Sequence, residues 1–136
     1  MREGIEQAFG PVARRRLWTY AVASAQRGYW DEAEKVLLSL MPFDDMRSDV
    51  LAATAFLAWR RTQDPEAAGD LAVHAARGCA VALVFLGYVH LDVHLPLPAI
   101  LALQAVLQSD DPTARELAVH LQRHLAHHLE HSPLPS

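Results

Sequence analysis

The chain has 136 residues, and its 12 Lys and Arg against 16 Asp and Glu give a formal net charge of −4 with histidine neutral. It contains 23 alanines and 20 leucines but 6 glycines, a composition that favours closely packed helices. This composition argues against a β-sandwich, a collagen, a disulfide scaffold and a disordered chain. The only cluster of basic residues is Arg14–Arg16, which is too small to hold a nucleic-acid backbone.

The single cysteine, Cys79, excludes an internal disulfide and fits a reducing compartment. Residues 1–6 hold two acidic side chains and lack the apolar segment of a signal peptide. Residues 78–91 are uncharged but shorter than the roughly 20 residues that a membrane span needs. We therefore expect a cytoplasmic protein without membrane insertion, in which residues 78–91 include a buried helix.

Breakers and capping signals predict seven helices along the chain. Gly10-Pro11 begins the first and Gly28 ends it. Asp64-Pro65-Glu66 and Asp110-Asp111-Pro112 each place an N-cap before a proline in the first turn of a later helix. The expected helices span residues 11–27, 31–41, 47–62, 65–77, 79–92, 98–108 and 112–130. Residues 1–131 should form one helical domain, and residues 132–136 a disordered tail.

A repeat links these helices in pairs. Ala33, Ala67 and Ala99 each have a leucine four residues later, a small residue twelve earlier and a leucine sixteen earlier. Facing small residues let the two helices of a hairpin approach closely. The spacing resembles the tetratricopeptide repeat (TPR), so we expect an all-α fold of three stacked antiparallel TPR-like pairs and a C-terminal capping helix. The alternative is an unrelated seven-helix bundle.

The first helix of each TPR pair lines a concave groove, and its groove positions in this chain are mostly apolar. The predicted partner-binding residues are Trp18, Val22, Ala52, Phe56, Trp59, Val84, Tyr88 and Leu91. Such a groove typically receives an amphipathic helix. We expect Phe56→Asp to abolish binding without unfolding the chain, and Leu51→Asp to unfold it. In the alternative interpretation, the last helix folds back and fills the groove.

Few residues suggest catalysis or a metal site. His90 and His94 have the i,i+4 spacing of a helical metal pair, but a proline follows at once and no third ligand is identifiable. Cys79 lies in an apolar segment and is predicted to be an inert thiol. We expect neither an enzyme nor a cofactor. The last helix carries leucines at every fourth position with histidines beside them, at Leu117, Leu121, Leu125, Leu129, His120, His124, His127, His128 and His131.

Over residues 17–126 the chain resembles the small TPR chaperones of bacterial type III secretion, and among them the needle-subunit chaperones. The resemblance rests on the order of four motifs. They are Asp31-Glu32-Ala33-Glu34, the apolar segment 50–59, Leu83-x2-Leu86-Gly87, and Gln108-Ser109-Asp110-Asp111-Pro112. It implies a cytoplasmic chaperone that takes the C-terminal helix of the needle subunit into its groove and prevents premature polymerisation. It also implies a small helical co-chaperone on the first repeat.

Two other functions share the predicted fold. One is a TPR chaperone for a translocator or another export component. The other is a general TPR adaptor for peptide tails, which usually carries Lys or Arg in its groove, where this chain offers Arg15. An enzyme with a histidine-bound metal is a third class, and it lacks an identifiable ligand set.

Because no ligand set can be assembled from the sequence, we predict that folding is independent of metal. Treatment with EDTA should leave the helical circular-dichroism signal and the melting temperature unchanged. A loss of helix that zinc restores would instead identify His90 and His94 as ligands.

Overall fold

The computed structural model describes residues 10–131, which form seven α-helices and no strand within that range. The prediction of an all-α chain is therefore confirmed. The helices are α2 (Pro11–Gln26), α3 (Trp30–Leu40), α4 (Arg47–Thr62), α5 (Pro65–Ala76), α6 (Ala80–Asp92), α7 (Pro96–Leu107) and α8 (Pro112–His131). The predicted tail, residues 132–136, lies outside the described residues.

Local signals explain where these helices begin and end. Gly28 and Gly78 follow α2 and α5 with φ of +86° and +97°, a left-handed conformation that glycine adopts without a Cβ clash. Asp64 Oδ1 accepts the Glu66 N–H at 3.0 Å and caps α5. α7 begins at Pro96, two residues before the predicted start. A proline is accommodated in the first helical turn because the N–H that it lacks would have no intrahelical acceptor there.

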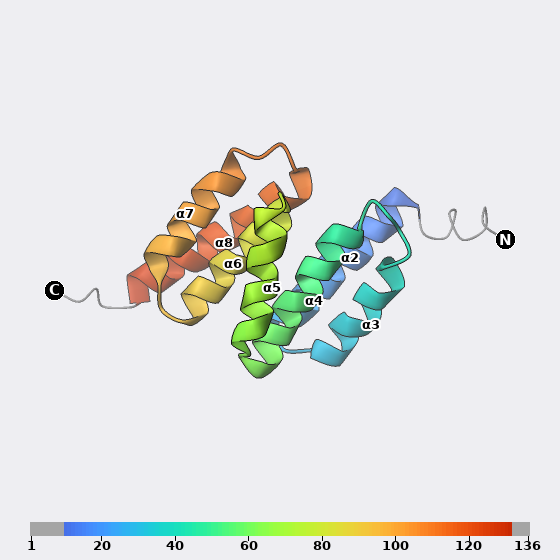
Figure 1. Cartoon of the computed structure of the whole chain (residues 1–136), viewed down its shortest axis with the longest axis horizontal. Helices are drawn as coiled ribbons and strands as arrows, with labels where there is room; N and C mark the ends of the chain where they lie inside the picture. Colours follow the sequence, from blue (N-terminus) through green and yellow to red (C-terminus); the bar gives the residue numbers. More distant parts are fainter. Residues whose placement is uncertain (1–9, 132–136) are drawn as a thin grey trace.

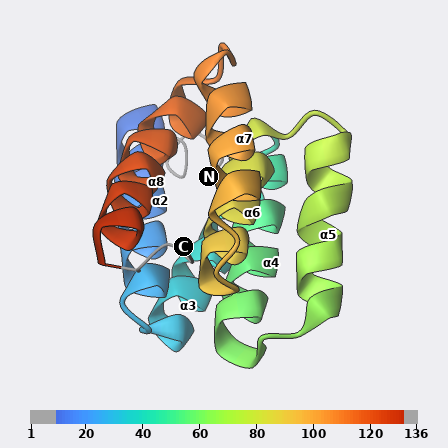
Figure 2. The ribbon, with the colours of Figure 1, turned by 90° about the vertical axis from the view of Figure 1, so that its left-hand side faces the viewer.

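Neighbouring helices pack in chain order, as Figure 1 shows for the antiparallel pairs α2/α3, α4/α5 and α6/α7. The second helix of each pair also packs on the first helix of the next, and α8 takes that place after α7. α6 contacts both α4 and α8, whereas α2 touches α4 only lightly. Figure 2 shows α4 and α6 in the middle, with α2 and α8 on one side and α5 on the other.

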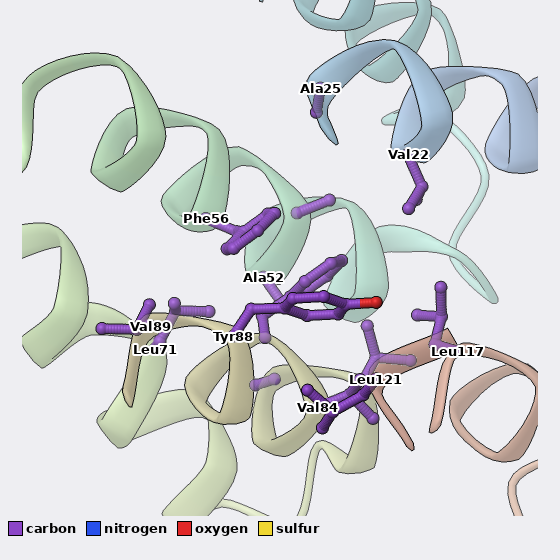
Figure 3. Packing of buried hydrophobic residues seen from close by; sticks show 14 of the residues in the cluster. Val22, Ala25, Ala52, Phe56, Leu71, Val84, Tyr88, Val89, Leu117 and Leu121 are labelled. Atoms are coloured by element: carbon purple, nitrogen blue, oxygen red, sulfur yellow. The ribbon is translucent and has the colours of Figure 1, made fainter. Parts of the chain in front are cut away.

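The core is aromatic where α4 meets α6. Phe56 and Phe85 stack with ring centroids 4.6 Å apart, and both are almost fully buried. Tyr88 tilts against Phe56 at 5.8 Å (Figure 3). Trp18 of α2 reaches Phe85 at 6.5 Å. These side chains connect three helices that are far apart in the sequence, and such aromatic contacts add to the stabilisation from buried area.

The repeat positions divide between buried and exposed ones. Ala33, Ala67 and Ala99 are buried as expected of close helix contacts. Leu51 was expected in the seam of a pair, but it is 36% exposed. It shares its outer stripe with Thr54 and Ala58, while other residues supply the buried face of α4. The assignment of Leu51 to the buried seam is therefore wrong, and we no longer expect Leu51→Asp to unfold the chain.

α6 and α8 approach most closely at a glycine. A Cβ built on Gly87 would lie 2.6 Å from Cδ2 of Leu121, which is itself fully buried. A side chain at position 87 would push α8 outward or force Leu121 from its rotamer. The missing Cβ thus sets how near α8 lies to α6.

We predict that Gly87→Val lowers the free energy of unfolding by about 1–3 kcal/mol, because overpacking strains this contact. Chemical denaturation of the variant should show it. Leu121→Ala in the same chain should recover part of the loss by making room, which a double-mutant cycle measures. Gly69→Ala is the control: a Cβ there meets nothing within 4 Å, and we expect a gain of about 0.5–1 kcal/mol. Additive losses in the cycle would contradict the contact.

Candidate functional site: the seam between α2 and α8

The predicted groove is closed. All eight predicted groove side chains are buried, with exposed fractions of 7% or less, and they belong to the hydrophobic core: Trp18, Val22, Ala52, Phe56, Trp59, Val84, Tyr88 and Leu91. The expectation that they line an open groove is wrong for this state of the chain. Whether they bind a partner stays a prediction.

The last helix provides much of this cover. Leu117, Leu121 and Leu125 of α8 are buried, and Figure 3 shows Leu117 and Leu121 beside Val84 and Tyr88. This arrangement corresponds to the alternative interpretation, in which α8 occupies the groove. The physical reason is that burial of apolar area stabilises the folded chain by about 25 cal/mol per Å², whichever segment covers it. α8 is joined to the stack and offers a leucine face.

α2 and α8 face each other across the closed groove without packing closely. A cavity of about 150 Å³ lies between them, and its walls are mostly apolar. α2 contributes Trp18, Thr19, Val22, Ala23 and Gln26, and α8 contributes Thr113, Glu116, Leu117 and His120. We call this boundary the α2/α8 seam. Arg15 and Glu116 bridge it with an exposed ion pair of 3.4 Å, which stabilises by less than about 1 kcal/mol.

One end of the seam holds the half-buried carboxyl group of Asp49. Burial raises the pKa of Asp49 to about 6, with help from the charge of Asp111, while a weak contact from the Cys79 thiol acts in the opposite direction. The thiol sulfur lies 3.9 Å from Asp49 Oδ1. Nearby, Arg14 pairs with Asp45 at 3.0 Å, and both residues line a second cavity with Asp49.

The opposite end is polar and holds several nitrogen donors. A pocket of about 430 Å³, hereafter the polar pocket, is lined by Gln26, Arg60, Tyr88, His120, Arg123, His124 and His127. The residues come from α2, α4, α6 and α8. The sequence does not predict this pocket, because Arg60 and Arg123 are far apart in the chain and line one pocket only once α8 packs on α6.

Arg60 is fixed by its neighbours. Its Nε lies 3.3 Å from Asp92 Oδ2 but lacks the alignment of a hydrogen bond, so this buried N–H has no acceptor. The same carboxylate oxygen accepts the Trp59 indole N–H at 2.9 Å. The guanidinium also lies over the rings of Phe56 and Tyr88, at 5.1 and 6.0 Å from their centroids. Arg60 is thus held in one place by an ion pair and two aromatic faces.

Burial also shifts titrating groups around the polar pocket. It lowers the pKa of His124, and the positive charge of Arg60 acts in the same direction while Asp92 opposes them. Burial raises the pKa of Tyr88, against a hydrogen bond with Gln26 and the charge of Arg60. His124 is therefore largely neutral at pH 7, and Tyr88 keeps its proton.

Within residues 10–131, no three His, Cys, Asp or Glu side chains gather closely enough to hold a metal ion. His94 stacks on His128 with ring centroids 5.8 Å apart, and burial lowers the pKa of His90.

Among the residues that the structure describes, no helix combines the length and hydropathy needed to cross a bilayer.

Comparison with protein-family models, curated proteins and solved structures finds no match to this chain. The resemblance to type III secretion chaperones therefore stays a prediction.

Burial reverses the expected effects of two substitutions. We predict that Phe56→Asp abolishes cooperative unfolding of the free chain, because Phe56 is 1% exposed and a buried unpaired carboxylate costs several kcal/mol. The matched control is Leu51→Asp on the exposed stripe of the same helix, with an expected loss of less than about 1 kcal/mol. Thermal unfolding followed by circular dichroism compares the two. A stable Phe56→Asp chain would show that this face is open in solution.

We predict that Asp49 makes stability depend on pH. Its folded pKa of about 6 lies above the ordinary 3.8, so its favourable contribution is complete below pH 3.8 and is lost as the pH rises through 6. Asp49→Asn should raise the free energy of unfolding above pH 7 by about 1–2 kcal/mol, after allowance for solvent screening. Denaturation curves at several pH values test this. The exposed Asp70→Asn should show no such trend, and an equal effect of both variants would count against the assignment.

Proposed function

We propose that the chain is a non-enzymatic, TPR-like helical chaperone that binds an amphipathic helix of a partner along the α2/α8 seam. The observation that carries this proposal is the loosely packed seam over an apolar interior. The order of helix packing supports a TPR-like stack, since α8 takes the position that the first helix of a further pair would have. We expect this function in the bacterial cytoplasm.

Binding requires the seam to open. The α2/α3 pair is attached chiefly through α3 on α4, because the backbone of α2 comes close to that of α4 at few residues and to that of α8 at fewer still. A rotation of this pair would uncover Trp18, Val22 and Tyr88, at a cost of about 1.5–3 kcal/mol for each large apolar side chain. A partner helix with its own apolar face would offset this cost by burying the same side chains. The partner must therefore prefer the open state.

The needle subunit of a type III secretion system is the proposed partner. Its amphipathic C-terminal helix would be covered in the seam, so the surface that drives polymerisation would be hidden before export. A small helical co-chaperone would pack on α2 and α3, where Tyr20, Leu38 and Tyr29 of the connecting turn are exposed. No cofactor is required for burial of this kind.

The second candidate function is a chaperone for a translocator or other export component, or a general adaptor for peptide tails. The polar pocket favours this class, because Arg60 and Arg123 supply cationic side chains of the kind with which such adaptors bind peptide tails. From the sequence, Arg15 was the only cationic side chain expected in the groove. An apolar helix partner and a polar tail partner would occupy different parts of the same seam.

We predict that co-expression with the needle subunit of the same genome gives a soluble complex near 1:1, or 1:1:1 with the co-chaperone. Size-exclusion chromatography with light scattering measures the ratio. The needle subunit should stay monomeric in the complex and form filaments without it. Equal filament formation with and without this chain would overturn the needle assignment.

A crosslink tests the opening. In a Cys79→Ser background, Arg15→Cys and Glu116→Cys place thiols at the exposed ion pair that bridges the seam. A short bis-maleimide that joins them should lower partner affinity at least tenfold, because the seam cannot open. The same double variant capped with a monofunctional maleimide is the control and should bind as before. Undiminished binding by the crosslinked chain would place the partner elsewhere.

A further inference from the structure

The polar pocket concentrates positive charge in a chain whose net charge is −4. Its wall contains two arginines, three histidines, an amide and a phenol, and no carboxylate. Asp92 pairs with Arg60 but does not line the pocket. Arg123 is exposed and has no ion pair or hydrogen bond with any residue that the structure describes. The pocket therefore offers donors in excess of acceptors.

We propose that the polar pocket is an anion site that takes a carboxylate of the helical partner, with Arg60 and Arg123 as the charged donors. This inference rests on the proposed function for its occupant, since the pocket lies at one end of the seam along which the partner helix would lie. Gln26 and Tyr88 add neutral donors, so the pocket can bind the two oxygens of a carboxylate from several directions.

The charge count favours a carboxylate over a phosphate. Asp92 compensates Arg60, and His124 is largely neutral at pH 7, which leaves Arg123 as the uncompensated cation of the pocket. One uncompensated charge matches a monoanion better than a dianion. An anion would in turn favour the protonated form of His124, against the burial that lowers its pKa, so binding should strengthen as the pH falls. The groups that titrate or carry charge around it are His120, Arg123, His124, His127 and His128 of α8, Arg60 of α4, and Tyr88 and Asp92 of α6.

Anion binding can be tested without any partner. Acetate and inorganic phosphate are titrated into the full chain while the ring signals of its histidines are followed by NMR. We expect saturable shifts of His120, His124 and His127 with acetate. Arg123→Gln should weaken acetate binding at least fivefold, and Arg115→Gln, an exposed arginine on the same helix outside the pocket, should not. No saturable shift, or an equal loss in both variants, overturns the proposal.

Further measurements distinguish a carboxylate from a phosphate, and failure of the anion site from failure of the proposed function. Phosphate binding tenfold tighter than acetate would overturn the carboxylate assignment in favour of a phosphate group. With the co-expressed needle subunit, Arg123→Gln should reduce affinity at least fivefold while Arg115→Gln leaves it unchanged. If the subunit binds the Arg123→Gln chain as well as the original, the proposed function stands and its carboxylate does not occupy the pocket. If acetate binds as expected and the subunit does not bind at all, the needle assignment fails and the anion site stands.

Discussion

The fold depends on covering α6, a helix with no charged side chain before Asp92. A helix that is apolar on all sides must be buried on all sides. α4, α5, α7 and α8 provide this cover, and each of them packs directly on α6. The other helices are arranged around this requirement: α5 and α7 cover the outer faces, and α8 closes the side that three helix pairs alone would leave open. Gly87 permits that closure, because it lets Leu121 enter the surface of α6.

The requirement to cover α6 also determines which helix packs least closely on the rest of the stack. α2 lies at the end of the stack and has its main contacts with α3. Across the seam it meets α8 through a mostly apolar cavity and one exposed ion pair. Regions with few packed neighbours open at lower free energy than the core. A partner that enters between α2 and α8 would thus displace these contacts and uncover Tyr88, while the packing of α6 on α4, α5, α7 and α8 stays in place.

Helices were predictable from the sequence because their signals are local. The aspartate caps of α5 and α8 and the glycines after α2 and α5 act within one turn of the chain. The closure of the groove was not predictable from the sequence, because an apolar residue has the same sequence signature whether a partner or α8 covers it. Gly87 was expected to face the small residue of its paired helix, but the atoms nearest to its missing Cβ belong to Leu121 of α8. The polar pocket depends on that same long-range contact.

The two ends of the seam differ in a way that bears on how a helix would lie in it. Toward the beginning of α8 the charges are paired, because Arg14 bonds Asp45 and Arg15 bonds Glu116. Toward its later turns Arg123 lies beside Arg60 without an ion pair among the described residues. A helix carries partial positive charge at its N-terminus and partial negative charge at its C-terminus. The unpaired charge of Arg123 would therefore favour an amphipathic helix with its C-terminus at the polar pocket. Apolar burial would provide the affinity, and the charge at the polar pocket would select one direction of binding over the other.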